Sequence, residues 1–354
     1  MKNQNSKPKA KEMNSAPYKR SGGLSVGVIL LVVTVVSFVL SFALGRYPVS
    51  PGDVVRIFAS RILPIHRTWS SIEDTVVIQI RLPRILAALL VGASLAIAGA
   101  SFQGLFRNPL VSPDILGVSS GASVGAAFAI LLYQNRIVIQ VSAFCFALVA
   151  VALTYAMGRT VRGNPTLSLI LAGVAIGSLF TAFLSLIKYV ADPLNQLPAI
   201  TYWLMGSLAS VSTGDLIYSS IPIISGTAIL LLLRWRLNVL AMGEEEAKAL
   251  GVDTNKLRGI IIVCCSVVTG ASVCISGIIG WVGLVIPHIG RMLVGPNHKV
   301  LLPVTVLLGA SYLLLIDDIV RTIYLVELPI GILTSIIGAP FFVYLLNRGR
   351  WGWT

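Results

Sequence analysis

The chain has 354 residues, of which 56% are hydrophobic and 12% are charged, and its formal net charge is +13. The mean hydropathy of +0.87 excludes a soluble domain, because apolar runs near 20 residues long recur and roughly 20 helical residues cross a bilayer core. Helices satisfy their own backbone hydrogen bonds in lipid, so we expect an all-α, polytopic membrane bundle. The basic residues lie in loops and at the termini, which suits a signal for orientation in the membrane and argues against a nucleic-acid partner.

The predicted elements begin with a polar, lysine-rich segment, residues 1–23, which we interpret as a disordered cytoplasmic tail. A transmembrane domain follows over residues 24–347, and residues 348–354 form a second cytoplasmic tail. The eighth predicted span is short and contains Pro287, His288 and Arg291. With it the count is about ten, over residues 24–44, 85–105, 115–133, 137–157, 166–189, 215–233, 258–279, 282–295, 300–318 and 329–346.

Basic residues indicate the orientation of the spans. Most of them fall before the first span or in loops that an even span count places on the same side, which is the cytoplasm by the positive-inside rule. Both termini are then cytoplasmic, and the protein lies in the cytoplasmic membrane. Residues 45–84 break the rule, because this outer segment holds six arginines. They either contact lipid headgroups or form a docking surface for carboxylates, which guanidinium groups pair bidentately.

The second and seventh spans contain an internal repeat. "GASLAIAGASFQGLFRNP" from Gly92 and "GASVCISGIIGWVGLVIP" from Gly270 share small residues and a proline at an offset of 178 positions. The two spans are expected to run in opposite directions, and inverted repeats are typical of transporters, with the substrate path at their interface. Glycines at helical spacing, such as Gly173 and Gly177, indicate close helix packing.

The source of energy is indicated by what the sequence lacks. Ionisable residues are sparse inside the spans, which argues against an ion-coupled secondary transporter, and Asp317 and Arg321 near one span end can pair with each other. The phosphate-binding pattern G-x-x-x-x-G-K-[ST] does not occur, so ATP, if it is used, is bound by another chain. The four cysteines fall in apolar runs without metal-site spacing, and we expect no cofactor and no metal.

The charged stretch "LNVLAMGEEEAKALGVDTNK", residues 237–256, falls on the cytoplasmic side. Acids follow its first glycine and a second glycine ends it, which suits a short helix. It is either a solvated loop or a helix that sits in a cleft of a soluble ATPase. The second interpretation assigns the ATPase contact to Gly243, Glu244, Glu245, Glu246, Ala247, Leu250 and Gly251.

The motifs together resemble the FecCD family of ABC importer permeases, which serves iron–siderophore complexes, haem and cobalamin. The resemblance covers roughly residues 45–347 and is carried by "RLPRILAALLVGASLAIAGA", "QGLFRNPLVSPDILGVSSGAS", "YWLMGSL", "ALGV", "GWVGLVIPHIGRMLVGPNHKVLLP" and "ELPIGILTSIIGAPFF". It implies ATPase subunits, an extracytoplasmic binding protein and a second permease subunit as partners in the bilayer. A membrane receptor or scaffold is a rival that the repeat and the cytoplasmic loop oppose.

The resemblance also implies roles for particular residues. Arg81, Arg84 and Arg321 would dock the binding protein through its glutamates. The pathway would lie between two permease subunits, along the fifth and tenth spans, and we assign to it Gly173, Gly177, Ser335, Gly338 and Pro340. We expect a ferric siderophore as cargo, with haem or cobalamin as the alternative. His66, His288 and His298 are not expected to bind haem.

Overall fold

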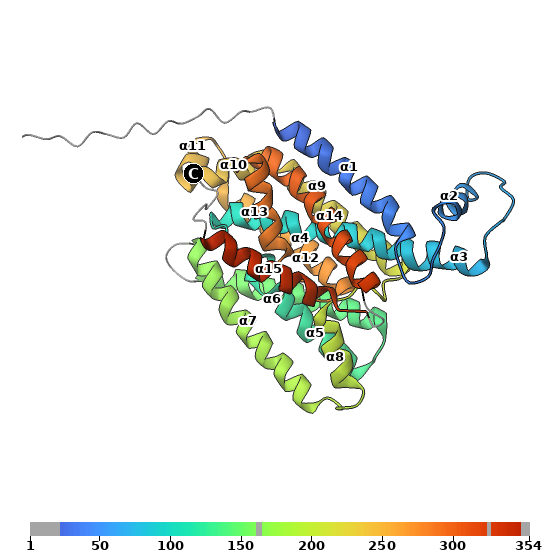
Figure 1. Ribbon diagram of the computed structural model, residues 1–354. Coiled ribbons are helices and arrows are strands. Elements are labelled where there is room, and N and C mark those ends of the chain that lie inside the picture. The colour runs from blue at the N-terminus through green and yellow to red at the C-terminus, as the bar shows by residue number, and fades with distance from the viewer. Residues whose placement is uncertain (1–21, 161–164, 324–326, 348–354) are drawn as a thin grey trace, which may run out of the picture.

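The computed structural model describes residues 22–160, 165–323 and 327–347, and these residues form helices and connecting loops (Figure 1). Both predicted tails fall mainly outside the described residues. The helices are α1 (Gly22–Ala43), α2 (Pro51–Ala59), α3 (Ser71–Thr75), α4 (Leu82–Phe106), α5 (Val118–Leu132), α6 (Arg136–Thr160), α7 (Pro165–Val190), α8 (Gln196–Met205), α9 (Thr213–Leu232), α10 (Arg234–Met242), α11 (Glu244–Ala249), α12 (Thr254–Ser276), α13 (Val282–Val294), α14 (His298–Ile323) and α15 (Ile330–Asn347).

Each of the ten predicted spans corresponds to an apolar helix. Seven helical segments in the described part of the chain are long and apolar enough to cross a membrane, and α5, α13 and α15 are shorter apolar helices. The third span begins later than predicted, at Val118, because a 3₁₀ turn over Pro113–Leu116 and Gly117 in a left-handed conformation precede it. The fold is therefore the expected all-α, multi-pass bundle.

The second span begins earlier than its sequence suggests. α3, a π-helical turn over Val76–Arg81 and α4 form one continuous helical segment, Ser71–Phe106. Pro83 has no N–H group and would break a regular helix at this point. The preceding π-helical turn, in which the N–H of Leu82 bonds to the carbonyl of Val77, carries the chain into α4.

The centre of the bundle is formed by α4, α12 and α14. In the most apolar windows of α4 and α12, 78% of residues are buried, against 17% in α1 and 22% in α7. Close approach explains the small residues of this core, because a Cβ on Gly92 of α4 would collide with the backbone of Gly309 on α14, and the reverse also holds. α1 and α7 lie at the periphery, and their apolar faces are exposed.

The sequence repeat appears in the structure as the crossing of α4 and α12. Ser94 Oγ and Ser272 Oγ lie 2.5 Å apart, and Cys265 Sγ lies 3.8 Å from the carbonyl oxygen of Ala98. The contacts advance along α4 as they retreat along α12, so the two helices are antiparallel. Beyond α4 and α12 the two copies of the repeat differ in structure. Pro109 lies in the loop after α4, whereas the equivalent Pro287 lies inside α13.

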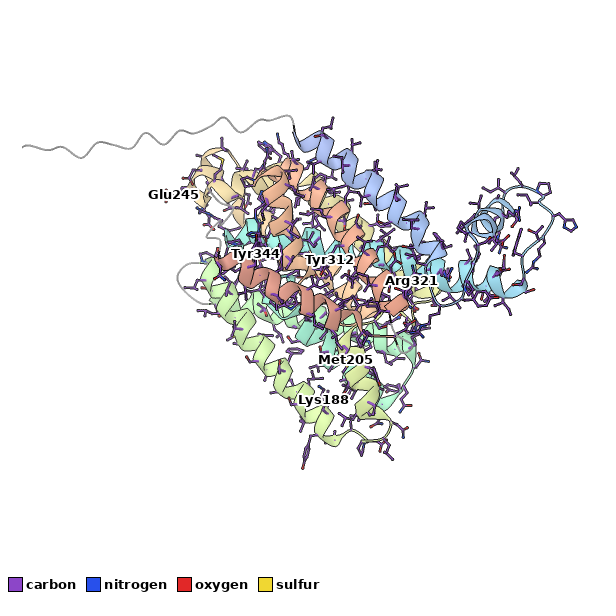
Figure 2. All side chains as sticks on the ribbon, in the orientation of Figure 1. Lys188, Met205, Glu245, Tyr312, Arg321 and Tyr344 are labelled. Carbon is purple, nitrogen blue, oxygen red and sulfur yellow. The ribbon has the colours of Figure 1, made fainter. Side chains whose placement is uncertain are left out.

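The bundle has two distinct ends (Figure 1). α10 and α11 lie at the end where α1 begins and α15 finishes, and α2 and α3 stand out from the opposite end. Glu245 and Arg321 mark these two ends (Figure 2). By the predicted orientation, α11 is at the cytoplasmic end and Arg321 at the outer end.

Candidate functional site

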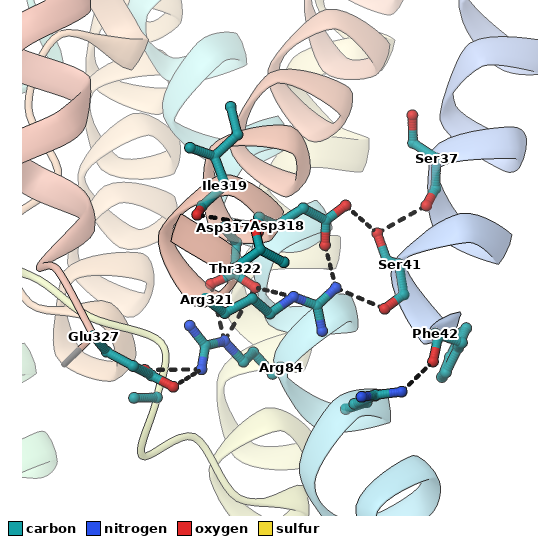
Figure 3. A network of polar contacts seen from close by, with 12 residues as sticks. Ser37, Ser41, Phe42, Arg84, Asp317, Asp318, Ile319, Arg321, Thr322 and Glu327 are labelled. Atoms are coloured by element: carbon teal, nitrogen blue, oxygen red, sulfur yellow. Dashed lines mark hydrogen bonds and ion pairs between the residues drawn. The ribbon is translucent and has the colours of Figure 1, made fainter. Parts of the chain in front are cut away.

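The outer end holds a buried ionic network centred on Arg84 (Figure 3). Arg84 Nε lies 2.9 and 3.0 Å from the two carboxylate oxygens of Asp317, and Nη1 lies 3.0 and 2.9 Å from those of Glu327. The side chain of Asp317 is fully buried and that of Arg84 is 6% exposed. Arg84 therefore joins α4 to α14 and to the residues that precede α15.

Arg321 continues the network toward α1. It pairs with Asp318 and donates a 2.7 Å hydrogen bond to the carbonyl oxygen of Ser41 near the end of α1. Ser41 Oγ in turn donates to Asp318 Oδ2 at 2.6 Å. The predicted pair of Asp317 with Arg321 is present at 3.9 Å. These contacts attach the outer ends of α1 and α14 to each other.

Arg81 has a different set of partners. It donates to the carbonyl oxygens of Phe42 and Tyr47, so it satisfies backbone acceptors at the end of α1. Arg81 and Arg84 are three positions apart in a helix, yet one contacts α1 and the other contacts α14 and Glu327. Arg81 ends the π-helical turn over Val76–Arg81, and Arg84 lies in the first turn of α4.

The ion pairs of this outer network join two arginines, Arg84 and Arg321, to the carboxylates of Asp317, Asp318 and Glu327. Arg81 contacts backbone carbonyl oxygens instead. Taken over the whole residue, each of the three arginines is at most 5% exposed. The structure therefore gives them partners within the chain, and their docking role stays a prediction. Glu327 was not singled out from the sequence, because the fold brings it to Arg84 across 243 positions.

Other arginines of the outer segment lie on the surface of the part formed by α2 and α3. Arg61 Nη2 lies 2.9 and 2.8 Å from the two carboxylate oxygens of Asp74, and Arg56 Nη1 lies 3.4 Å from Asp53 Oδ1. The arginine side chains of these pairs are more than half exposed. Exposed pairs of this kind contribute at most about 1 kcal/mol, so they leave the arginines accessible to partners or headgroups.

At the cytoplasmic end, the predicted short helix is present as α11. Glu245, Glu246 and Leu250 are exposed, and Leu250 reaches 59% exposure. Ala247 is fully buried against the chain's own core, and its assignment to the ATPase contact stays a prediction. Gly243 and Gly251 have positive φ angles of 153° and 76°, which glycine adopts most readily.

Two polar contacts attach this segment to the spans. Glu244 pairs with Arg258 near the start of α12. Asn238 Oδ1 on α10 accepts from the backbone N–H of His298 at 2.7 Å and lies 3.0 Å from His298 Nδ1, at the start of α14. A displacement of α10 and α11 would therefore reach both α12 and α14. His298 is buried and contacts this amide, so its side chain has a structural role that does not involve haem.

The predicted pathway residues divide into two groups. On α15, Ser335 and Pro340 are exposed, whereas Gly338 is buried against Trp281. Trp281 has a φ of 70°, a rare conformation for a bulky residue, and its ring centroid lies 6.1 Å from that of Phe342. α15 thus rests on Trp281, which the sequence did not reveal.

On α7, the two predicted glycines pack inside the chain. A Cβ on Gly173 would collide with the carbonyl of Ile115, and Gly177 lies beside Ser120. The exposed face of α7 instead carries hydroxyl groups at helical spacing, from Ser178, Thr181 and Ser185. The assignment of Gly173 and Gly177 to a pathway stays a prediction, and close packing accounts for both.

The antiparallel repeat, the short cytoplasmic helix and the buried outer network define a polytopic membrane permease. The chain belongs to the FecCD transport family, whose family model matches residues 32–348. It is therefore the permease type of ABC importers and not itself an enzyme.

Individual relatives span most of the chain. The chain is 42% identical over 323 residues to the molybdate import system permease protein MolB of Haemophilus influenzae, covering 90% of this chain and 95% of the relative. It is 43% identical over 286 residues to a probable iron chelatin transport system permease protein of Helicobacter pylori, covering 81% and 86%. A solved structure described as an inward-facing, putative metal-chelate type ABC transporter matches with a TM-score of 0.83 and 41% identity, over 92% of this chain and 99% of that one.

Proposed function

We propose that this chain is the membrane subunit of an ABC importer that moves a ferric siderophore into the cytoplasm. The observation that carries the proposal is the family match over residues 32–348, which covers the helices of both bundle ends. The relative named for iron chelatin supports an iron complex as cargo. Haem and cobalamin remain the alternatives within the same class.

A second cargo is favoured by a specific observation. The relative named for molybdate matches 90% of this chain, a larger share than the one named for iron chelatin. Molybdate is a compact oxyanion, whereas a siderophore complex is a large chelate. A binding protein needs a small site for molybdate and a large one for a siderophore complex. The identity of the cargo can therefore be read from what the binding protein binds.

The ATPase is proposed to bind at α10 and α11. The exposed residues Glu245, Glu246 and Leu250 form the contact surface, and the ties of Glu244 to Arg258 and of Asn238 to His298 carry its displacement into the spans. The basic residues of the cytoplasmic loops support this orientation, which also places both termini in the cytoplasm.

The pathway is proposed to lie between two permease subunits, either two copies of this chain or this chain and a paralogue. The exposed hydroxyl groups of α7 and Ser335 on α15 would face the partner subunit, because polar groups favour a partner or water over lipid. A binding protein would deliver the cargo at the outer end, where Arg84 and Arg321 lie.

The test is uptake by the assembled transporter in proteoliposomes, with its ATPase and binding protein supplied from the same source. We expect ATP-dependent uptake of labelled ferric siderophore and none of haem, cobalamin or molybdate. Uptake of molybdate alone would replace the siderophore assignment with the second cargo. A transporter that binds none of the four would contradict both.

A further inference from the structure

Glu327 is the most accessible acidic member of the outer network. Its side chain is 31% exposed, whereas Asp317 on the other side of Arg84 is fully buried. It lies three positions before α15 begins at Ile330. Figure 3 shows it reaching Arg84 from a different segment than the α14 carboxylates. A group that approaches from outside therefore meets Glu327 before it meets Arg84.

The outer start of α15 is held by few polar contacts. The N–H of Ile330 donates to the carbonyl oxygen of Gly206 at 2.9 Å, and Gly331 packs against the carbonyl of Met205. The pair between Glu327 and Arg84 ties the same region to α4. The loss of this pair would remove the polar tie between the outer start of α15 and α4.

We propose that a carboxylate of the binding protein replaces Glu327 on Arg84 during docking, and that this exchange releases the outer start of α15. The inference rests on the proposed function and deepens it. Glu327 is a positioning residue in this scheme, since it acts on the pathway through α15. Its role before docking is to hold both Arg84 and α15 in place.

The charges of the network favour an exchange over a simple addition. The ion pairs already involve two arginines, Arg84 and Arg321, and three carboxylates, so a fourth carboxylate would add to the excess of negative charge. Replacement of one carboxylate by another leaves the charge unchanged.

The experiment compares the Glu327→Gln variant with the unaltered transporter, both assembled with the ATPase in nanodiscs. The amide keeps the size of the side chain but removes the competing charge. Because a hydrogen bond to a charged group contributes about 1.5–3 kcal/mol, we expect docking of the binding protein to tighten by about tenfold or more. ATP hydrolysis without the binding protein should also rise severalfold, since α15 is already released.

The matched control is Asp74→Asn, which removes one negative charge from the exposed pair with Arg61 at the same end of the bundle. It should leave docking within about twofold, as expected for an exposed pair. Unchanged or weaker docking of Glu327→Gln would overturn the exchange, and unchanged basal hydrolysis would overturn the release of α15. If the unaltered transporter does not dock any binding protein, the proposed function itself fails.

Discussion

Ser94 Oγ and Ser272 Oγ lie 2.5 Å apart and both residues are fully buried, although 178 positions separate them. This separation is the offset of the internal repeat, so equivalent residues of the two copies touch each other. Two equivalent residues can meet in this way only close to the pseudo-twofold axis that relates the copies. Because α4 and α12 are antiparallel, that axis lies in the plane of the membrane, as in other inverted-repeat transporters.

The first prediction concerns this crossing. Each hydroxyl also lies within hydrogen-bond distance of a carbonyl oxygen of its own helix, that of Val91 for Ser94 and that of Val268 for Ser272. One of the two can donate across the crossing while the other donates to its own helix, so Ser94→Ala should cost only about 0.6 kcal/mol of stability. Ser94→Leu should cost about 1–3 kcal/mol or more, because the crossing has no room for a larger side chain. Thermal unfolding of the purified protein in detergent measures both. Equal stability of the two variants would contradict the close crossing.

The second prediction concerns the outer network. Arg84→Gln leaves Asp317 buried without the guanidinium that contacts both of its carboxylate oxygens, which should destabilise the protein by about 3–5 kcal/mol. Adding Asp317→Asn should recover part of this loss, because the uncompensated charge is then removed. Unfolding of the single and double variants gives the coupling between the two residues. If the loss of stability in the double variant equals the sum of the losses in the two single variants, the two residues are not coupled.

The third prediction separates the two faces of α11. Glu245→Lys combined with Glu246→Lys changes exposed residues only, and it should lower uptake while the subunit still inserts and folds. Glu244→Gln is the comparison, because it breaks the pair with Arg258 inside the chain and should act mainly on stability. The measurements are uptake and binding of the ATPase. Normal ATPase binding by the double variant would place the contact elsewhere.

The fourth prediction concerns the seat of α15 on Trp281. Gly338→Val should displace α15, because even a Cβ at this position would lie 2.6 Å from the Trp281 side chain. Uptake should fall at least tenfold, while Ala339→Val, at the half-buried neighbouring position, should keep most of it. Both variants are measured at equal amounts in membranes. Equal uptake by the two variants would show that this contact does not position the pathway helix.

The sequence predicts much of this fold because the signals involved are local. Apolar runs gave the ten helices, and the glycines and acids of residues 243–251 gave α11. The repeat was readable because Ser94 and Ser272 sit in matching strings of small residues. Pairing between distant segments was not readable in this way. Glu327 has no local feature that points to Arg84, and only the packing of α4, α14 and the start of α15 brings them together.

The arginines illustrate the same limit. Their number and their outer position suggested a surface, yet the fold buries Arg81, Arg84 and Arg321 against α1 and α14. The partners of Arg81 and Arg84 lie far away in the sequence, so no local pattern around Pro83 indicates them. The pair between Asp317 and Arg321 could be predicted from the sequence, because the two residues are four positions apart on a helix. This pair is present.

The account depends most on the claim that ATP hydrolysed by another chain drives transport through this one. The most direct measurement is uptake of labelled ferric siderophore by proteoliposomes that contain the permease, its ATPase and the binding protein. We predict that uptake stops when ATP is removed and continues when the proton gradient is collapsed at constant ATP. Uptake that continues without ATP and stops when the gradient collapses would contradict the account and favour an ion-coupled transporter.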